Sequence, residues 1–267
     1  MFGKLLKYEW RAAGHALLPF YLVVLAVSAV NSLMIHLGSG GPSEELMDSA
    51  LGELIQLIGF MLYFGVIVAL IILTAVVIVQ RFYKGIVGDE GCLVLTAPVD
   101  LWEIPLAKCV IGLVFTGLSV MAGVCSIIIL MNPAEFLRMI REVDWLRAIE
   151  QLNLYMPRWG MYGAEIILSL MLAGMAEMYH VYLAIMLGQL SNTHKAAFSF
   201  LWYVVINVVF TALSWFAFAG FDVHSLDLLF LEMGAHAALL TSIGISALQV
   251  LLFAAGTQYL MAKRMNV

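Results

Sequence analysis

Long apolar stretches alternate with short polar ones along the whole chain. A helix needs about 20 apolar residues to cross roughly 30 Å of hydrocarbon, and each stretch reaches that length. Because lipid offers backbone groups no hydrogen-bond partner, these stretches are expected to be helices. The fourth is interrupted by Glu165 and Glu177 and is otherwise apolar. The predicted spans are residues 12–43, 54–80, 109–134, 161–187, 196–221 and 233–262.

Composition places this pattern in a membrane. Of the 267 residues, 63% are hydrophobic and 12% are charged, and the mean hydropathy is +1.00. Soluble domains carry about 25% charged residues, and one of this size could not bury so much apolar surface in a single core. We therefore predict an all-α membrane protein in which residues 1–267 form one transmembrane domain. The net charge of −5 argues against a nucleic-acid partner, because no basic patch is large enough to neutralise phosphates.

The basic residues predict the orientation of the chain, because Lys and Arg gather on the cytoplasmic side of membrane proteins. With both termini inside, nine of the thirteen basic residues are cytosolic, and the other four lie among acidic residues of an outer segment. We therefore expect the N-terminus and the C-terminus in the cytosol. The nine cytosolic residues are Lys4, Lys7, Arg11, Arg81, Lys84, Lys108, Lys195, Lys263 and Arg264.

The N-terminal residues 1–14 have the pattern of an amphipathic helix. Apolar residues recur at helical spacing on one face, and basic residues occupy another. Such a helix lies in the headgroup plane with its basic side chains toward anionic lipid, so membrane lipid is a predicted partner.

A second amphipathic helix is predicted outside the membrane, over residues 132–159. Asn132 and Pro133 suit the cap and the first position of a helix, an apolar stripe comes next, and Pro157 ends it. This helix could cap or gate an exit near the fourth span, or simply pack on the outer ends of its neighbours.

The densest group of charges between two spans is the cytosolic segment, residues 81–104. Glycines loosen the backbone, and Asp89 and Glu90 suit a helix N-terminus. Pro98 and Pro105 interrupt the chain between this point and the third span. The segment is interpreted as a short helix outside the membrane that is presented to a partner. An ordinary loop between two spans is the alternative.

Three common catalytic motifs are absent from the chain. It has no phosphate-binding loop, no HExxH zinc motif and no GxSxG nucleophile elbow. We therefore predict no catalytic residue, no metal site and no cofactor on this chain.

Polar residues inside the spans are the remaining candidates for function. Glu177 falls near the middle of the fourth span, and His180 lies three residues later on the same face. A charge at this depth costs about 2.5–3.5 kcal/mol, so it usually faces a bundle interior or a wet cavity. The pair lines a translocation pathway or bonds neighbouring helices, and we favour the second interpretation. Weaker members of the same set are Gln56, Asn207 and Gln249. The aromatic residues of the fifth span, Tyr203 included, are expected to face lipid or the membrane interface.

Three polar segments resemble those of a known family. They read KLLKYEWR at 4–11, RFYKGIVGDEGCLVLTAPV at 81–99 and GQLSNTHK at 188–195. The chain resembles the six-helix permease subunits of bacterial type-2 ATP-binding-cassette exporters over nearly its whole length. It departs from the family pattern at Cys92 and Ala97, which bears on the partner surface.

The resemblance implies a coupling helix in the cytosolic segment that docks on a separate ATPase subunit. ATP and Mg would then bind to that partner, and a second permease, identical or related, would complete the exporter in the bacterial cytoplasmic membrane. The cargo stays open between peptide, drug and lipid-like compound. Carried over by position, the ATPase contact would comprise Gly88, Asp89, Glu90, Gly91, Cys92, Leu93, Leu95, Thr96 and Pro98.

Two other function classes stay open from the residues alone. A non-transporting membrane sensor or immunity protein would be stable without any ATPase partner. An intramembrane enzyme would lose its activity when Glu177 or His180 is changed.

Overall fold

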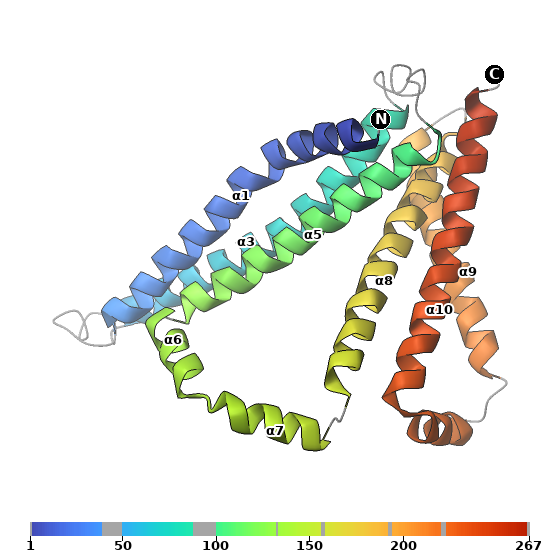
Figure 1. The fold of residues 1–267 in the computed structure, drawn as a ribbon. Helices are drawn as coiled ribbons and strands as arrows, with labels where there is room; N and C mark the ends of the chain where they lie inside the picture. The colour runs from blue at the N-terminus through green and yellow to red at the C-terminus, as the bar shows by residue number, and fades with distance from the viewer. Residues whose placement is uncertain are drawn as a thin grey trace. The chain divides into compact units, whose positions relative to one another are not determined.

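The structure is a computed structural model that describes residues 2–38, 50–87, 100–131, 133–155, 158–191, 194–219 and 223–265. Every regular element in these ranges is a helix (Figure 1). In chain order the elements are α1 (Phe2–Gly38), α3 (Ala50–Phe82), the π-helix η1 (Tyr83–Val87), α5 (Glu103–Leu130), α6 (Pro133–Glu142), α7 (Trp145–Tyr155), α8 (Trp159–Gly188), α9 (Lys195–Ala219) and α10 (Val223–Met265).

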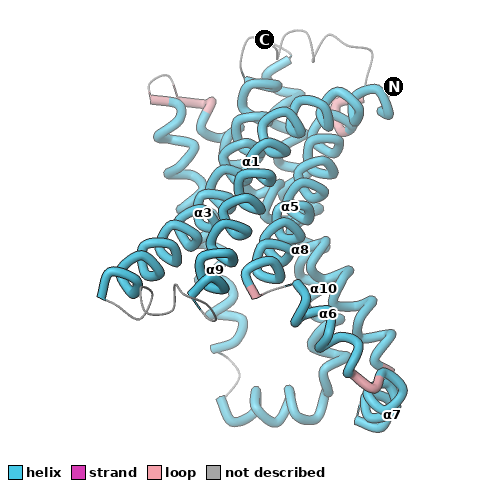
Figure 2. Tube along the Cα trace, turned by 90° about the vertical axis from the view of Figure 1, so that its left-hand side faces the viewer, coloured by secondary structure: helices cyan, strands magenta, loops and turns pink. Residues whose placement is uncertain are grey.

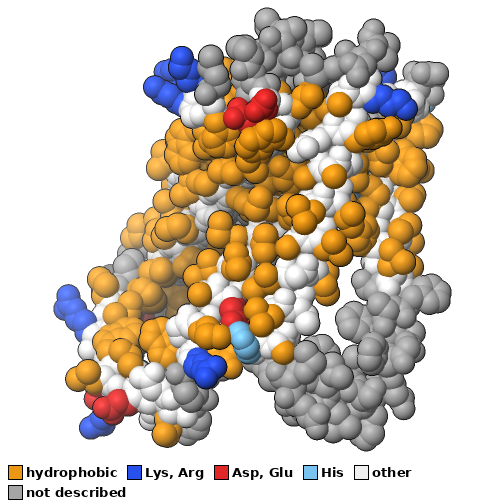
Figure 3. All heavy atoms as spheres, turned by 45° about the vertical axis from the view of Figure 1, so that its right-hand side comes forward, with side chains coloured by type: hydrophobic (Ala, Val, Ile, Leu, Met, Phe, Trp, Pro, Cys, Tyr) orange, Lys and Arg blue, Asp and Glu red, His pale blue; other side chains and the backbone are white. Residues whose placement is uncertain are grey.

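Six of the described helices are long and apolar enough to cross a membrane, which confirms the predicted number of spans. The spanning segments are Phe2–Ile35, Gly52–Val87, Glu103–Leu130, Trp159–Gly188, Lys195–Leu213 and His236–Lys263. The prediction of an all-helical, multi-pass membrane protein is confirmed at this level. On the face in Figure 3, hydrophobic side chains cover the middle of the helices, and most charged side chains lie near helix ends.

The chain divides into two compact units. Unit 1 comprises residues 1–6, 79–113 and 152–267, and unit 2 comprises residues 7–78 and 114–151. The helices α3 and α5 run without interruption from one unit into the other. A single transmembrane domain over the whole chain stays a prediction.

In unit 2, hydroxyl groups join α1, α3 and α5. The Tyr21 hydroxyl donates to the Phe115 carbonyl at 3.1 Å and lies 2.9 Å from Ser119 Oγ, which in turn lies 2.8 Å from Thr74 Oγ1. These groups are buried among apolar side chains. Because lipid cannot satisfy them, their mutual hydrogen bonds favour this arrangement of the three helices.

Two further contacts hold the same helices nearer their other ends. The Asn31 side-chain amide of α1 donates to the Gly59 carbonyl of α3 at 2.9 Å. The Tyr63 hydroxyl of α3 lies 3.0 Å from Ser126 Oγ of α5. Small residues thus let polar groups bridge neighbouring helices, which is the usual way helices associate in lipid.

In unit 1, α8 is the central helix, and it packs against both α9 and α10. The helices α8 and α9 approach each other closely at Gly188, where a Cβ atom would lie 2.6 Å from the backbone N and Cα of Ser199 and closer still to its Oγ. The Ser199 hydroxyl donates to the Ile185 carbonyl at 3.4 Å. The absence of a side chain at Gly188 therefore lets α9 cross the end of α8.

The region predicted as one amphipathic helix, residues 132–159, differs from the prediction, because its described residues form two short helices, α6 (Pro133–Glu142) and α7 (Trp145–Tyr155). A short loop separates them (Figure 2). Asp144 begins the second helix: its Oδ1 accepts the backbone N–H of Arg147 at 3.3 Å, as an N-cap residue does. The prediction that the first helix starts with Pro133 is confirmed.

The N-terminal segment also differs from the prediction. Residues 2–14 are helical, but they continue directly into the first span as part of α1, with Pro19 inside the helix. The helix predicted for these residues is therefore continuous with the first span. The placement of these residues at the membrane surface stays a prediction.

Replacing Gly188 by Ala is expected to destabilise the protein by about 1–3 kcal/mol, because the new methyl group meets backbone that cannot rotate away. Thermal unfolding in a fixed detergent measures the effect. Gly163→Ala is the matched control on the same helix, since a Cβ there meets no described atom within 4 Å. Equal unfolding temperatures for the two variants would contradict the close approach of α8 and α9.

Candidate functional site

A cavity of about 340 Å³ lies among the three helices α8, α9 and α10 of unit 1. Two alanines of α8 leave the space open, and polar and aromatic side chains surround it. Four of the five polar residues that the sequence analysis selected line this one cavity. Its walls are Ala173, Ala176, Glu177 and His180 of α8, Asn207, Phe210 and Thr211 of α9, and Gln249 and Phe253 of α10.

The fifth candidate, Gln56, lies elsewhere. It belongs to the exposed part of α3 in unit 2 and does not line this cavity. The position of the Gln56 amide inside an apolar stretch therefore did not by itself predict whether it lines the cavity.

Glu177 both bonds a neighbouring helix and faces the cavity. The Tyr203 hydroxyl of α9 donates to its Oε1 at 2.7 Å. Its Oε2 lies 3.8 Å from His180 Nδ1, which is an ion-pair distance and too long for a hydrogen bond. The Glu177 side chain is nevertheless 59% exposed, whereas that of His180 is 6% exposed. The carboxylate thus keeps accessible acceptor capacity.

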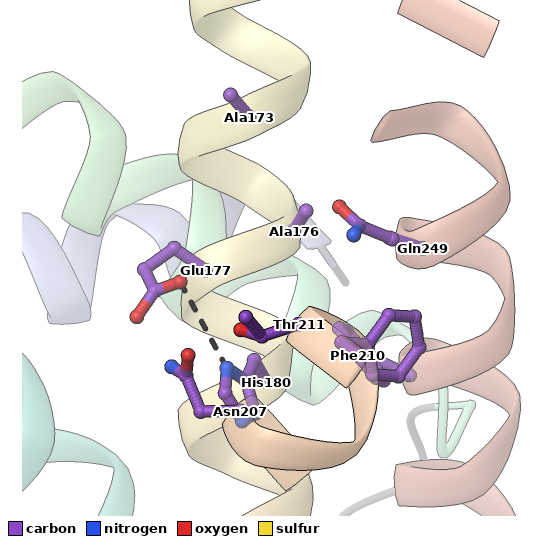
Figure 4. A pocket seen from close by; sticks show the side chains of 9 residues that line it. Ala173, Ala176, Glu177, His180, Asn207, Phe210, Thr211 and Gln249 are labelled. Carbon is purple, nitrogen blue, oxygen red and sulfur yellow. Dashed lines mark ion pairs between the residues drawn. The ribbon is translucent and has the colours of Figure 1, made fainter. Parts of the chain in front are cut away.

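His180 is held inside a stack of rings. Its imidazole lies nearly parallel to the Tyr203 ring, with centroids 4.6 Å apart at 20°, and to the Phe253 ring, with centroids 5.3 Å apart at 24°. Phe210 meets Phe253 edge to face at 5.0 Å. Aromatic side chains from two neighbouring helices therefore fix the imidazole beside Glu177. Figure 4 shows Glu177, His180 and Asn207 grouped on one side of the cavity, with Gln249 reaching in from α10 on the other.

A second carboxylate–imidazole pair lies nearer the start of α8. Glu165 Oε1 is 2.6 Å from His236 Nδ1 of α10, and the Tyr162 ring meets the His236 ring edge to face. About one helical turn along α8, Ser169 Oγ lies 3.1 Å from Ser242 Oγ. These contacts join α8 to α10 outside the cavity, and the spacing of Glu165 alone could not reveal its partner.

The nine residues predicted to contact an ATPase, between Gly88 and Pro98, lie outside the described residues. The helix ends that flank them are described, and both belong to unit 1. Phe82, at the end of α3, stacks on Tyr182 of α8 with centroids 3.8 Å apart at 5°. The two side chains are 0% and 1% exposed. The end of α3 is therefore packed rigidly against α8.

The π-helix η1 comes directly after α3 and brings the start of α5 close. Lys108 of α5 is buried, and its Nζ donates to the Arg81 carbonyl at 3.2 Å. A Cβ on Gly85 would lie 2.5 Å from that Nζ, so a side chain there would require the end of Lys108 to move. π-helical turns occur often at functional sites. The start of α5 is thus bonded to the end of α3, and the end of α3 is packed against α8.

Several residues of these sites were not predicted from the sequence. Tyr203 was expected to face lipid, but its hydroxyl bonds Glu177. Phe82 and Tyr182 were not selected, because the candidates inside the spans were chosen for their polar side chains. Both nevertheless lie close in sequence to candidate residues. Within the described residues, no group of three or more His, Cys, Asp or Glu side chains could hold a metal ion.

Comparisons of the chain with protein-family models, curated proteins and solved structures found no match.

Tyr203→Phe is expected to lower the stability by about 0.6–1.7 kcal/mol, because Glu177 loses its interhelical hydrogen bond while the ring stack stays. Thermal unfolding in detergent is again the measurement. Tyr259→Phe on the exposed face of α10 serves as the control and should leave the unfolding temperature unchanged. A Tyr203→Phe variant as stable as this control would rule out a structural role for the bond.

Proposed function

We propose that this chain is the membrane-spanning subunit of an ATP-driven exporter, working with a second permease and a separate ATPase subunit in a bacterial cytoplasmic membrane. The observation that carries the proposal is the attachment of the end of α3 to α8, the helix that also carries the cavity, together with the bond from the start of α5 to the end of α3. The resemblance of this segment to the coupling region of type-2 exporters supplies the partner.

The packing of α3 against α8 would carry motion from the cytosolic segment to the cavity. Protein interiors are close-packed and transmit displacement instead of absorbing it. An ATPase that moves the cytosolic segment would displace Phe82, and the buried stack would pass that motion to Tyr182. His180 and Glu177 lie two and five residues before Tyr182 on the same helix. ATP hydrolysis on the partner would thereby alter the surroundings of the cavity.

The orientation of unit 1 is consistent with a cytosolic motor. The end of α3, the start of α5, the end of α8, the start of α9 and the end of α10 lie together at one end of this unit (Figure 1). These parts of the chain contain Lys84, Lys108, Lys195 and Lys263. A shared basic end supports a cytosolic location for it and for the cytosolic segment.

Purification in mild detergent from the native membrane is expected to yield a stoichiometric second subunit that hydrolyses ATP. The reason is that this chain has no phosphate-binding loop of its own. Mass spectrometry of the purified complex identifies the subunit. A fully active protein that is purified without any ATPase would instead support the sensor or immunity alternative.

Reversing the charges of Asp89 and Glu90 together to Lys is expected to uncouple ATP hydrolysis from transport, because the proposed docking surface changes sign. ATPase stimulation by the permease and ATPase binding are measured side by side in proteoliposomes. The matched control is the double reversal of Glu135 and Glu142 to Lys on α6. Unchanged binding and unchanged stimulation in the Asp89 and Glu90 variant would remove the coupling proposal.

A further inference from the structure

The charged side chains that line the cavity of unit 1 indicate which class of ligand it can bind. Among its nine described lining residues, Glu177 is the one acidic residue, and neither Lys nor Arg is present. The lining would therefore repel an anion. It offers a single negative charge, more than half exposed, in a region where the protein could have placed an apolar side chain.

His180 lies beside this charge without covering it. Its Nδ1 is 3.8 Å from Glu177 Oε2, and its side chain is 6% exposed, whereas that of Glu177 is 59% exposed. Its Nε2 is buried and has no hydrogen-bond partner among the described residues. The Glu177 carboxylate is therefore the charged group of the lining that a ligand can reach.

The other walls suit a cation that can donate hydrogen bonds. Asn207, Thr211 and Gln249 each carry a side-chain oxygen on the lining, and they approach from α9 and α10. The rings of Phe210 and Phe253 form an apolar wall whose faces attract positive charge. Acceptors from three helices, together with two rings, match a small head group with several N–H donors and an attached apolar body.

We propose that this cavity binds a protonated amine attached to an apolar body, with Glu177 as the counter-ion. A cavity of about 340 Å³ holds the amine end of such a molecule together with one ring or a short alkyl chain. That such an amine is the transported cargo rests on the proposed exporter function. That the amine binds in the cavity depends on the cavity alone.

The test measures binding to the purified chain in lipid nanodiscs without any ATPase, by isothermal titration calorimetry. Three probes of matched shape are compared at neutral pH: 2-phenylethylamine, 2-phenylethanol and 3-phenylpropionate. We expect the amine to bind about tenfold more tightly than the alcohol or the carboxylate, because only the amine places a positive charge against Glu177. Equal binding of the three probes, tighter binding of the carboxylate, or no binding of the amine overturns the proposal.

Two variants locate the interaction. Glu177→Gln keeps the shape of the side chain and should weaken amine binding about tenfold while leaving binding of the alcohol unchanged. Glu165→Gln removes the other carboxylate of α8, which pairs with His236 outside the cavity, and should leave amine binding as it is. Unchanged amine binding in Glu177→Gln overturns the assignment. The probe series on the unaltered chain decides the question if a variant fails to fold.

A competition experiment separates the amine from an inorganic cation. Sodium chloride is compared with choline chloride at equal ionic strength, so screening is the same in both. Displacement of 2-phenylethylamine by sodium but not by choline would identify an inorganic cation site and overturn the proposal. Failure of an ATPase to co-purify would leave the binding result intact, and absence of amine binding would leave the exporter proposal intact.

Discussion

A polar group between these helices must find its partner inside the protein, because the surrounding hydrocarbon offers none. This constraint explains contacts in both units. In unit 2, Tyr21, Ser119 and Thr74 share one set of hydrogen bonds across three helices. In unit 1, the Tyr203 hydroxyl satisfies one oxygen of Glu177. The association of helices in lipid gains little from hydrophobic burial, so such bonds and close approaches at glycine decide which helices meet.

Because of the same constraint, a polar group that lacks a full set of hydrogen-bond partners indicates where a ligand can bind. The second oxygen of Glu177 lies 3.8 Å from the His180 ring nitrogen, and the carboxylate faces a cavity as well as a neighbouring helix. Glu165 differs, because its Oε1 lies against His236 and its side chain is almost buried. Two carboxylates of one helix thus have different environments. Glu165 joins α8 to α10, whereas Glu177 bonds α9 and is also accessible from the cavity.

Helix α8 connects the features on which the functional proposals depend. It contacts α9 and α10, carries Glu177 and His180 of the cavity, and receives the Phe82 ring at Tyr182. No flexible element intervenes within α8 between Glu177 and Tyr182, since both belong to one continuous helix. A displacement at the Tyr182 end of this helix would therefore reach the cavity through rigid structure, which is the property that the proposed coupled transport requires.

The sequence by itself determined the class of fold and the number of spans, because the length of an apolar stretch and its transfer into lipid are local properties of the chain. It also selected Glu177, His180, Asn207 and Gln249 as unusual residues, since a polar group in such a stretch is costly wherever it faces. Only the tertiary structure decided that these four share a cavity while Gln56 does not, that Tyr203 bonds Glu177, and that a helix end at Asp144 separates α6 from α7. The physical reason is that periodicity defines the faces of one helix, whereas the partner of each face depends on packing between segments far apart in the chain.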